Sequence, residues 1–305
     1  MFSESARKML EQIEAADMKA AFATKESLDG LYQAALEGAR HPFELPAFVQ
    51  ERAHVERRTA ADGTECFTLT PKAGPSNSLQ LLYYHGGGFV MQIGEPHWSF
   101  ALMLLERLAC TVTVPLYPLV PTCTYHEVFA SGAASYELVV DAAEGGLVVM
   151  GDSAGGTLAL AAGQQALVDG TRQPDLIVTL SPLTDVNSEL PGKDELGVHD
   201  PIIAPYGMRR VAKDWLSDGE ESTGDFPPCI LNGPFEGLAP VLDFVGSKET
   251  LLPDSLELAR RIALVGGSIE LIVKDGMWHT YPLMPQTDEA QEAIERIVTA
   301  AKACA

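Results

Sequence analysis

Residues 147–168, LVVMGDSAGGTLALAAGQQALV, contain the pattern that decides the fold. The apolar run Leu147–Met150 predicts a buried strand, and Thr157–Val168 predicts the helix that follows it. Between them stands Gly-x-Ser-x-Gly, in which a tight strand-to-helix turn holds the serine in a strained conformation and leaves its Oγ exposed. Glycines two residues to either side are needed because a Cβ there would collide with the neighbouring strand or helix. This context predicts Ser153 as a nucleophile.

Short segments rich in β-forming residues recur on both sides of this unit. The first two, separated by the turn signal Asp62-Gly63, suggest an antiparallel start to a sheet. From Leu79 onward, strand candidates alternate with helical stretches, which predicts an α/β fold whose parallel sheet is covered on both faces. The strand candidates are His54–Thr59, Cys66–Thr70, Leu79–Tyr84, Thr111–Leu116, Leu147–Met150, Leu176–Leu180, Val241–Val245 and Ile269–Val273.

Two regions lie outside this alternation. Residues 1–45 are predicted to be helical, because Leu28, Leu31, Tyr32, Ala35 and Leu36 follow the spacing of one helix face. Residues 187–228 are too many for a plain loop in a compact domain, and they contain one helical pattern around Trp215. We interpret them as an insertion lying over the sheet, with surface decoration as the alternative. The predicted organisation is a helical cap segment at 1–45 and a main domain at 46–305 that carries the insertion at 187–228.

Composition excludes several classes of partner. Lys and Arg number 21 against 42 Asp and Glu, so a net charge of −21 disfavours nucleic acid and anionic membrane surfaces. The five cysteines are scattered and no His, Cys or Asp cluster has metal-ligand spacing, so we expect no metal. Met1–Gln12 has no apolar core of the length a signal peptide needs, and we therefore expect a cytoplasmic location.

A second motif, Tyr84–Phe89 (YHGGGF), follows the strand candidate that ends at Tyr84. Consecutive glycines let backbone N–H groups approach a ligand closely and receive the oxyanion of a tetrahedral intermediate. A phosphate loop is the alternative, but neither a following Lys-Ser/Thr nor a GxGxxG spacing is present. His85 is predicted to pin this loop by hydrogen bonds, and Asp152 to brace the serine turn. The candidate oxyanion donors are the N–H groups of Gly86, Gly87, Gly88 and Ala154.

A serine nucleophile needs a base. In this fold class the chain order is nucleophile, acid, histidine, and only His199 and His279 follow Ser153. His199 lies in the insertion, whereas His279 follows the last strand candidate, where the sites of parallel sheets assemble. The base is therefore predicted to be His279. Trp278 beside it is a candidate for the pocket wall, as are Met208 and Trp215 unless they only pack in the core.

The acid should lie just beyond the strand candidate Val241–Val245. Glu249 and Asp254 are available there, while Asp243 is expected on the strand itself. Asp254 precedes a helical stretch and Glu257 follows three residues later, which resembles an N-cap with its capping-box partner. Because that structural role explains Asp254 without catalysis, Glu249 is the predicted acid.

HGGGF, GDSAGG and the C-terminal GMWH together resemble the hormone-sensitive-lipase-like branch of the α/β-hydrolases, which includes many carboxylesterases. The resemblance implies an eight-stranded, mostly parallel sheet, a helical cap and no cofactor. It also implies Ser153, His279 and Glu249 as the triad, with oxyanion donors at Gly87, Gly88 and Ala154. Family members often have Asp at the acid position, and their frequent YRLAPE stretch is replaced by YPLVPT at 117–122. Homodimers are common in the family, so a homodimer is compatible with the resemblance.

These residues predict a serine carboxylesterase that cleaves short- to medium-chain esters through an acyl-enzyme intermediate. The expected partner is a small-molecule ester. One alternative is a small-molecule-binding protein without activity on the same scaffold, although such proteins are expected to lack the base. The other is an amide or peptide hydrolase that uses the same groups.

Overall fold

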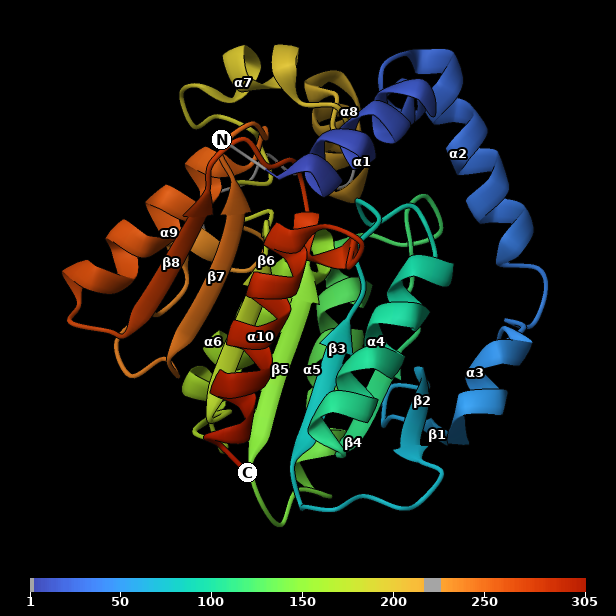
Figure 1. Cartoon of the computed structure of the whole chain (residues 1–305), viewed down its shortest axis with the longest axis vertical. Helices are drawn as coiled ribbons and strands as arrows, with labels where there is room; N and C mark the ends of the chain where they lie inside the picture. Colours follow the sequence, from blue (N-terminus) through green and yellow to red (C-terminus); the bar gives the residue numbers. More distant parts are fainter. Residues whose placement is uncertain (1–2, 217–225) are drawn as a thin grey trace.

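The computed structural model describes residues 3–216 and 226–305, and an eight-stranded sheet runs through the middle of this part of the chain (Figure 1). The strand order is β1-β2-β4-β3-β5-β6-β7-β8. The pairs β1–β2 and β2–β4 are antiparallel, and the remaining pairs are parallel. The strands are β1 Ala53–Thr59, β2 Glu65–Pro71, β3 Gln80–Tyr84, β4 Thr111–Pro115, β5 Leu147–Asp152, β6 Leu176–Leu180, β7 Val241–Gly246 and β8 Ile269–Lys274.

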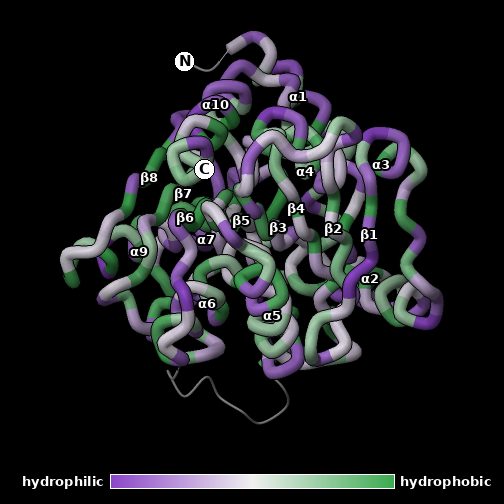
Figure 2. Tube along the Cα trace, turned by 90° about the horizontal axis from the view of Figure 1, so that it is seen from below, coloured by the Kyte–Doolittle hydropathy of each residue, from purple (hydrophilic) through white to green (hydrophobic). Residues whose placement is uncertain are grey.

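The prediction of an α/β fold with a mostly parallel sheet is confirmed, and each strand candidate overlaps an observed strand. Central strands could be located from sequence because both their faces are buried. In β3, Leu81 and Tyr83 point into one core cluster while Leu82 and Tyr84 point into the other. Hydrophobic segments accordingly gather on the inner strands of the tube in Figure 2.

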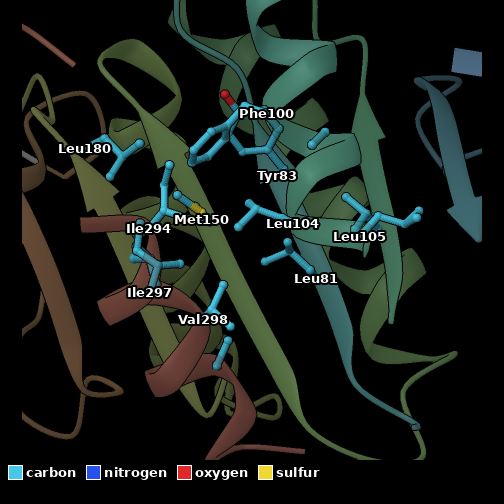
Figure 3. Packing of buried hydrophobic residues seen from close by; sticks show 14 of the residues in the cluster. Leu81, Tyr83, Phe100, Leu104, Leu105, Met150, Leu180, Ile294, Ile297 and Val298 are labelled. Carbon is cyan, nitrogen blue, oxygen red and sulfur yellow. The ribbon is translucent and has the colours of Figure 1, made fainter. Parts of the chain in front are cut away.

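Helices cover both faces of the sheet. One face carries α4 (Glu95–Leu108) and α10 (Asp288–Lys302), whose side chains pack on β3 and β5 as Figure 3 shows. The other face carries α5 (Tyr125–Val140), α6 (Ala154–Asp169) and α9 (Leu252–Leu264). This two-sided cover fixes the strand ends, where the loops that carry the predicted site residues begin.

A third group of helices lies beyond the carboxyl ends of the parallel strands (Figure 1). It contains α1 (Glu4–Ala15), η1 (Met18–Phe22) and α2 (Lys25–Gly38) from the N-terminal segment, and α7 (Lys193–His199) and α8 (Pro205–Trp215) from the insertion. The remaining short helices are α3 (Ala47–Arg52), η2 (Ile230–Asn232) and η3 (Tyr281–Leu283). No helix in the described part of the chain is long and apolar enough to span a bilayer.

The N-terminal helices and the insertion contact each other. Tyr32 of α2 donates its hydroxyl to Asp214 Oδ2 of α8 at 2.7 Å, and Lys19 of η1 donates to the Gly197 carbonyl of α7. The α1 segment is also anchored to α10, because the Ser3 backbone N–H and hydroxyl both bond the Glu289 carboxylate, at 2.6 and 2.8 Å.

The insertion differs from the expectation of a single helix. Its described part contains two, and α7 was not predicted because its seven residues present no apolar stripe. Residues 217–225 of the predicted insertion lie outside the described residues. The division into a cap and a main domain stays a prediction.

Candidate active site

Ser153 lies at the sharp turn between β5 and α6, with φ 52° and ψ −118°. A positive φ is strained for a residue with a Cβ, and such strain persists only where the surroundings enforce it. Here the chain has no room to relax. A Cβ on Gly151 would lie 2.1 Å from the Gly155 carbonyl oxygen, and a Cβ on Gly155 would lie 2.1 Å from the Tyr84 carbonyl oxygen. The two glycines therefore permit the close approach that leaves the Ser153 side chain projecting from the turn.

His279 and Glu249 come together from the loops after β8 and β7. His279 Nδ1 lies 3.5 Å from Glu249 Oε1, and both residues are buried. The other carboxylate oxygen of Glu249 accepts hydrogen bonds from Ser181 Oγ at 2.9 Å and from Gly246 N–H at 3.0 Å. The Glu249 side chain is therefore held on both of its oxygens.

Burial and charge compete at this pair. Burial lowers the pKa of His279, but the hydrogen bond and negative charge of Glu249 outweigh it, so the pKa lies above the ordinary 6.5. Burial raises the pKa of Glu249, and the contact with His279 offsets this only in part. The arrangement favours a proton on His279 more than water would, which suits a base that must take one up.

The sequence did not point to Ser181. This residue connects the loop after β7 that carries Glu249 (the acid loop) to the loop after β8 that carries His279 (the histidine loop). Its hydroxyl donates to Glu249 and accepts the N–H of Thr280 at 3.0 Å. Ser181 is fully buried and has a positive φ of 52° at the end of β6. One feature of the sequence could have pointed to Ser181: it is a polar residue directly after the apolar strand β6. The neighbouring strands β5 and β7 lead to Ser153 and Glu249.

The glycine loop after β3 presents backbone donors. Gly87 and Gly88 have φ of 121° and 61°, which only glycine adopts readily. Within residues 3–216 and 226–305, the N–H groups of Gly87, Gly88 and Ala154 have no hydrogen-bond acceptor. The inclusion of Gly86 among the donors is wrong, because its N–H already donates to Asp152 Oδ1 at 3.0 Å.

Asp152 and His85 hold this loop in place. Asp152 accepts the Tyr83 hydroxyl at 2.6 Å in addition to the Gly86 N–H, and His97 Nε2 lies 3.4 Å from its second oxygen. His85 stacks on Tyr117 with ring centroids 4.4 Å apart. Burial lowers the pKa of His85 to about 4, so the neutral ring donates from Nδ1 to the Gly86 carbonyl at 2.6 Å. Both side chains are engaged with the loop and not with a reacting group.

A cavity of about 500 Å³ opens beside these groups. Ser153, His279, Gly87 and Gly88 line it, and its walls are predominantly apolar. The walls come from segments far apart in the chain, including Met9 and Ile13 of α1, Phe22 of η1, Ile202 and Ile203 after α7, Met208 and Trp215 of α8, and Met284 after η3.

Two further expectations are corrected. Trp278 does not line the cavity; it is 1% exposed, packs in the core and donates its ring N–H to Met284 Sδ at 3.2 Å. Asp254 is not an N-cap, since it lies inside the first turn of α9. Its carboxylate instead accepts the N–H groups of Thr184 and Asp185 and pairs with Lys193 Nζ at 2.7 Å. Lys193 comes from α7, so no local pattern could reveal this partner.

No three His, Cys, Asp or Glu side chains in the described ranges are grouped so that they could hold a metal ion. The chemistry available at the site is that of a serine hydroxyl, an imidazole paired with a carboxylate, and free backbone N–H donors.

Comparison with known proteins identifies the family and the fold. A protein-family model described as alpha/beta hydrolase fold matches residues 81–283. An esterase from Acinetobacter venetianus is 26% identical over 234 residues, covering 75% of this chain and 77% of the relative. A triacylglycerol lipase from Mycobacterium tuberculosis is 27% identical over 232 residues, covering 74% of this chain and 47% of the relative. A solved hormone-sensitive lipase from a metagenome library has the same fold, with a TM-score of 0.81 at 24% identity over 100% of both chains. The chain therefore belongs to the α/β-hydrolase family, and its resemblance to the hormone-sensitive-lipase-like carboxylic ester hydrolases is confirmed.

Proposed function

We propose that this protein is a serine carboxylesterase that hydrolyses short- to medium-chain esters through Ser153, His279 and Glu249. The observation that carries the proposal is the convergence on one apolar cavity of a strained serine, a histidine paired with a buried carboxylate, and backbone N–H groups that bond no acceptor among the described residues. The named relatives are an esterase and a triacylglycerol lipase, which supports ester substrates for this chain as well.

In the proposed reaction, Ser153 Oγ attacks the ester carbonyl while His279 takes its proton. Glu249 holds Nδ1 of the imidazole, which orients the ring and stabilises the imidazolium. The N–H groups of Gly87, Gly88 and Ala154 receive the oxyanion; removal of one such donor typically costs about 10²–10³ in rate. His279 then protonates the departing alcohol, and water repeats the sequence on the acyl-enzyme.

The cavity supports the substrate size. Its volume of about 500 Å³ lies in the lower half of the range of small-molecule sites, roughly 300–1,000 Å³. An apolar lining suits the acyl chain and offers little to a peptide backbone, whose polar groups would need partners when buried.

The test is hydrolysis of p-nitrophenyl acetate, butyrate, octanoate and palmitate by the wild type and by Ser153→Ala. We expect turnover that is highest on acetate and butyrate and that disappears in the variant. A folded wild type that hydrolyses none of the four esters would overturn the proposal and direct attention to amides or to ligand binding. Turnover that survives in Ser153→Ala would remove Ser153 from its assigned role.

A further inference from the structure

Asp200 lies at the end of α7 in the insertion, and its carboxylate reaches the loop that carries the predicted triad acid. It is 1% exposed. Its Oδ2 accepts the backbone N–H of Thr250 at 2.8 Å, and Thr250 directly follows Glu249. A shift of the Thr250 backbone would therefore move the Glu249 side chain relative to His279.

The other oxygen of the same carboxylate contacts the cavity wall. Asp200 Oδ1 accepts the backbone N–H groups of Ile202 and Ile203, at 2.8 and 2.9 Å. Both isoleucines line the cavity beside Ser153. One buried side chain thus joins the wall of the substrate cavity to the acid loop.

Asp200 does not stabilise α7 by its place at the end of that helix. The carboxyl end of a helix carries partial negative charge, so a carboxylate there is unfavourable. A local turn accounts for the bonds to Ile202 and Ile203, but not for the bond to Thr250, which lies 50 residues away in the chain. The bonds of the Asp200 carboxylate are to the backbone N–H groups of Ile202, Ile203 and Thr250. Three backbone N–H groups that bond one buried carboxylate fix its direction.

The electrostatics support the same role. Burial lowers the pKa of His279; the hydrogen bond and charge of Glu249 raise it, and the charge of Asp200 adds to that rise. A second carboxylate near the pair stabilises the imidazolium that forms when the histidine accepts the serine proton.

We propose that Asp200 is a positioning residue that holds the acid loop through Thr250 and couples the cavity wall at Ile202 and Ile203 to the Glu249–His279 pair. This inference rests on the proposed esterase function. Asp200 does not line the cavity and touches no reacting atom; it acts through Glu249.

Asp200→Asn is the main variant, because the amide has the same shape but only one acceptor atom. It cannot accept the N–H of Thr250 and the N–H groups of Ile202 and Ile203 at the same time. With p-nitrophenyl acetate, whose acyl group is small, we expect kcat to fall about 10- to 100-fold through misplacement of the acid. KM should change little, since no residue that contacts this substrate is altered. A loss confined to KM, or kcat within about twofold of the wild type in a folded variant, would overturn the inference.

Lys19→Met is the matched control. Lys19 also attaches α7 to its surroundings, but its hydrogen bond is to the Gly197 carbonyl and not to the loop that carries Glu249. Its kcat should stay within about twofold of the wild type, as for most partly exposed sites. An equal loss of kcat in both variants would mean that any loosening of α7 suffices, and would refute a specific role for Asp200.

Asp200→Ala with added sodium formate is the rescue experiment. Formate can replace the missing carboxylate, so kcat should rise with its concentration, whereas Asp200→Asn should not respond. If Asp200→Ala does not fold, the comparison of Asp200→Asn with Lys19→Met decides. The wild type and Ser153→Ala test the proposed esterase function separately from the positioning role of Asp200. An inactive wild type overturns both, and an active wild type equalled by Asp200→Asn overturns only this one.

Discussion

Asp243 offers a quantitative test of the electrostatics behind the active site. It lies on β7, is fully buried and accepts the Thr179 hydroxyl at 2.8 Å. Burial raises the pKa of Asp243 from 3.8 to about 7, and the nearby charge of Glu249 adds to the rise. The folded protein therefore holds this proton at pH values where the unfolded chain has released it.

The sign and size of the effect follow from that difference. Between about pH 4 and pH 7 unfolding releases the proton, so the free energy of unfolding falls as the pH rises. The difference of about three pKa units corresponds to a contribution of roughly 4 kcal/mol to the free energy of unfolding. This contribution is fully present below the pKa of the unfolded chain and is lost above the pKa of the folded protein. Asp243→Asn has no such proton, and its amide oxygen can still accept the Thr179 hydroxyl. We expect its stability relative to the wild type to grow by roughly 3 kcal/mol between pH 5 and pH 8.

Urea denaturation of both proteins at pH 5, 6, 7 and 8 measures this difference. A difference in stability that stays constant across the series would refute the raised pKa of Asp243. Ester hydrolysis supplies a second readout. Asp243→Asn should keep its activity, whereas Glu249→Gln should lose most of it, and the reverse result would assign the triad acid to Asp243.

Three other predictions concern the site directly. Ser181→Ala removes the hydroxyl that bonds Glu249 and leaves the Thr280 N–H buried without an acceptor, so urea denaturation should show a loss of about 2–5 kcal/mol; an unchanged midpoint would contradict this account. Since the pKa of His279 is raised, kcat/KM should increase with pH through a midpoint above 6.5, and a midpoint below 6.5 would argue against Glu249 as its partner. Phe22 lines the cavity, and its ring lies next to Gly88 of the glycine loop. Phe22→Ala should therefore leave more room for a long acyl chain and raise kcat/KM for p-nitrophenyl octanoate relative to acetate. An unchanged ratio would show that the ring does not limit chain length.

Sequence reasoning succeeded where the determining contacts are local. The serine turn could be predicted because Gly151 and Gly155 are required by backbone atoms a few residues away or on the adjacent strand. The central strands could be predicted because apolar residues face two cores at once. Chain order and its place after the last strand predict His279 as the base; the structure places it 3.5 Å from Glu249, and its role stays a prediction.

It failed where a side chain depends on a partner from a distant segment. Asp254 resembles a helix cap, yet its carboxylate is committed to Lys193 and to the backbone after β6. Trp278 is next to His279 in sequence, but successive residues of a loop can point in opposite directions, and its ring lies in the core. Gly86 belongs to the glycine triplet, but Asp152 occupies its N–H. In each case the missing information was three-dimensional.

The anchoring of Ser3 on Glu289 has a consequence for the order of synthesis. A ribosome makes α1 well before α10, so Ser3 at the start of α1 cannot bond Glu289 until α10 has been synthesised. Met9 and Ile13 of α1 form part of the cavity, so this wall lacks its anchor on α10 until α10 has been made. The wall formed by α1 should consequently be among the later parts of the cavity to be fixed during synthesis, after Ser153 and His279 have both been made.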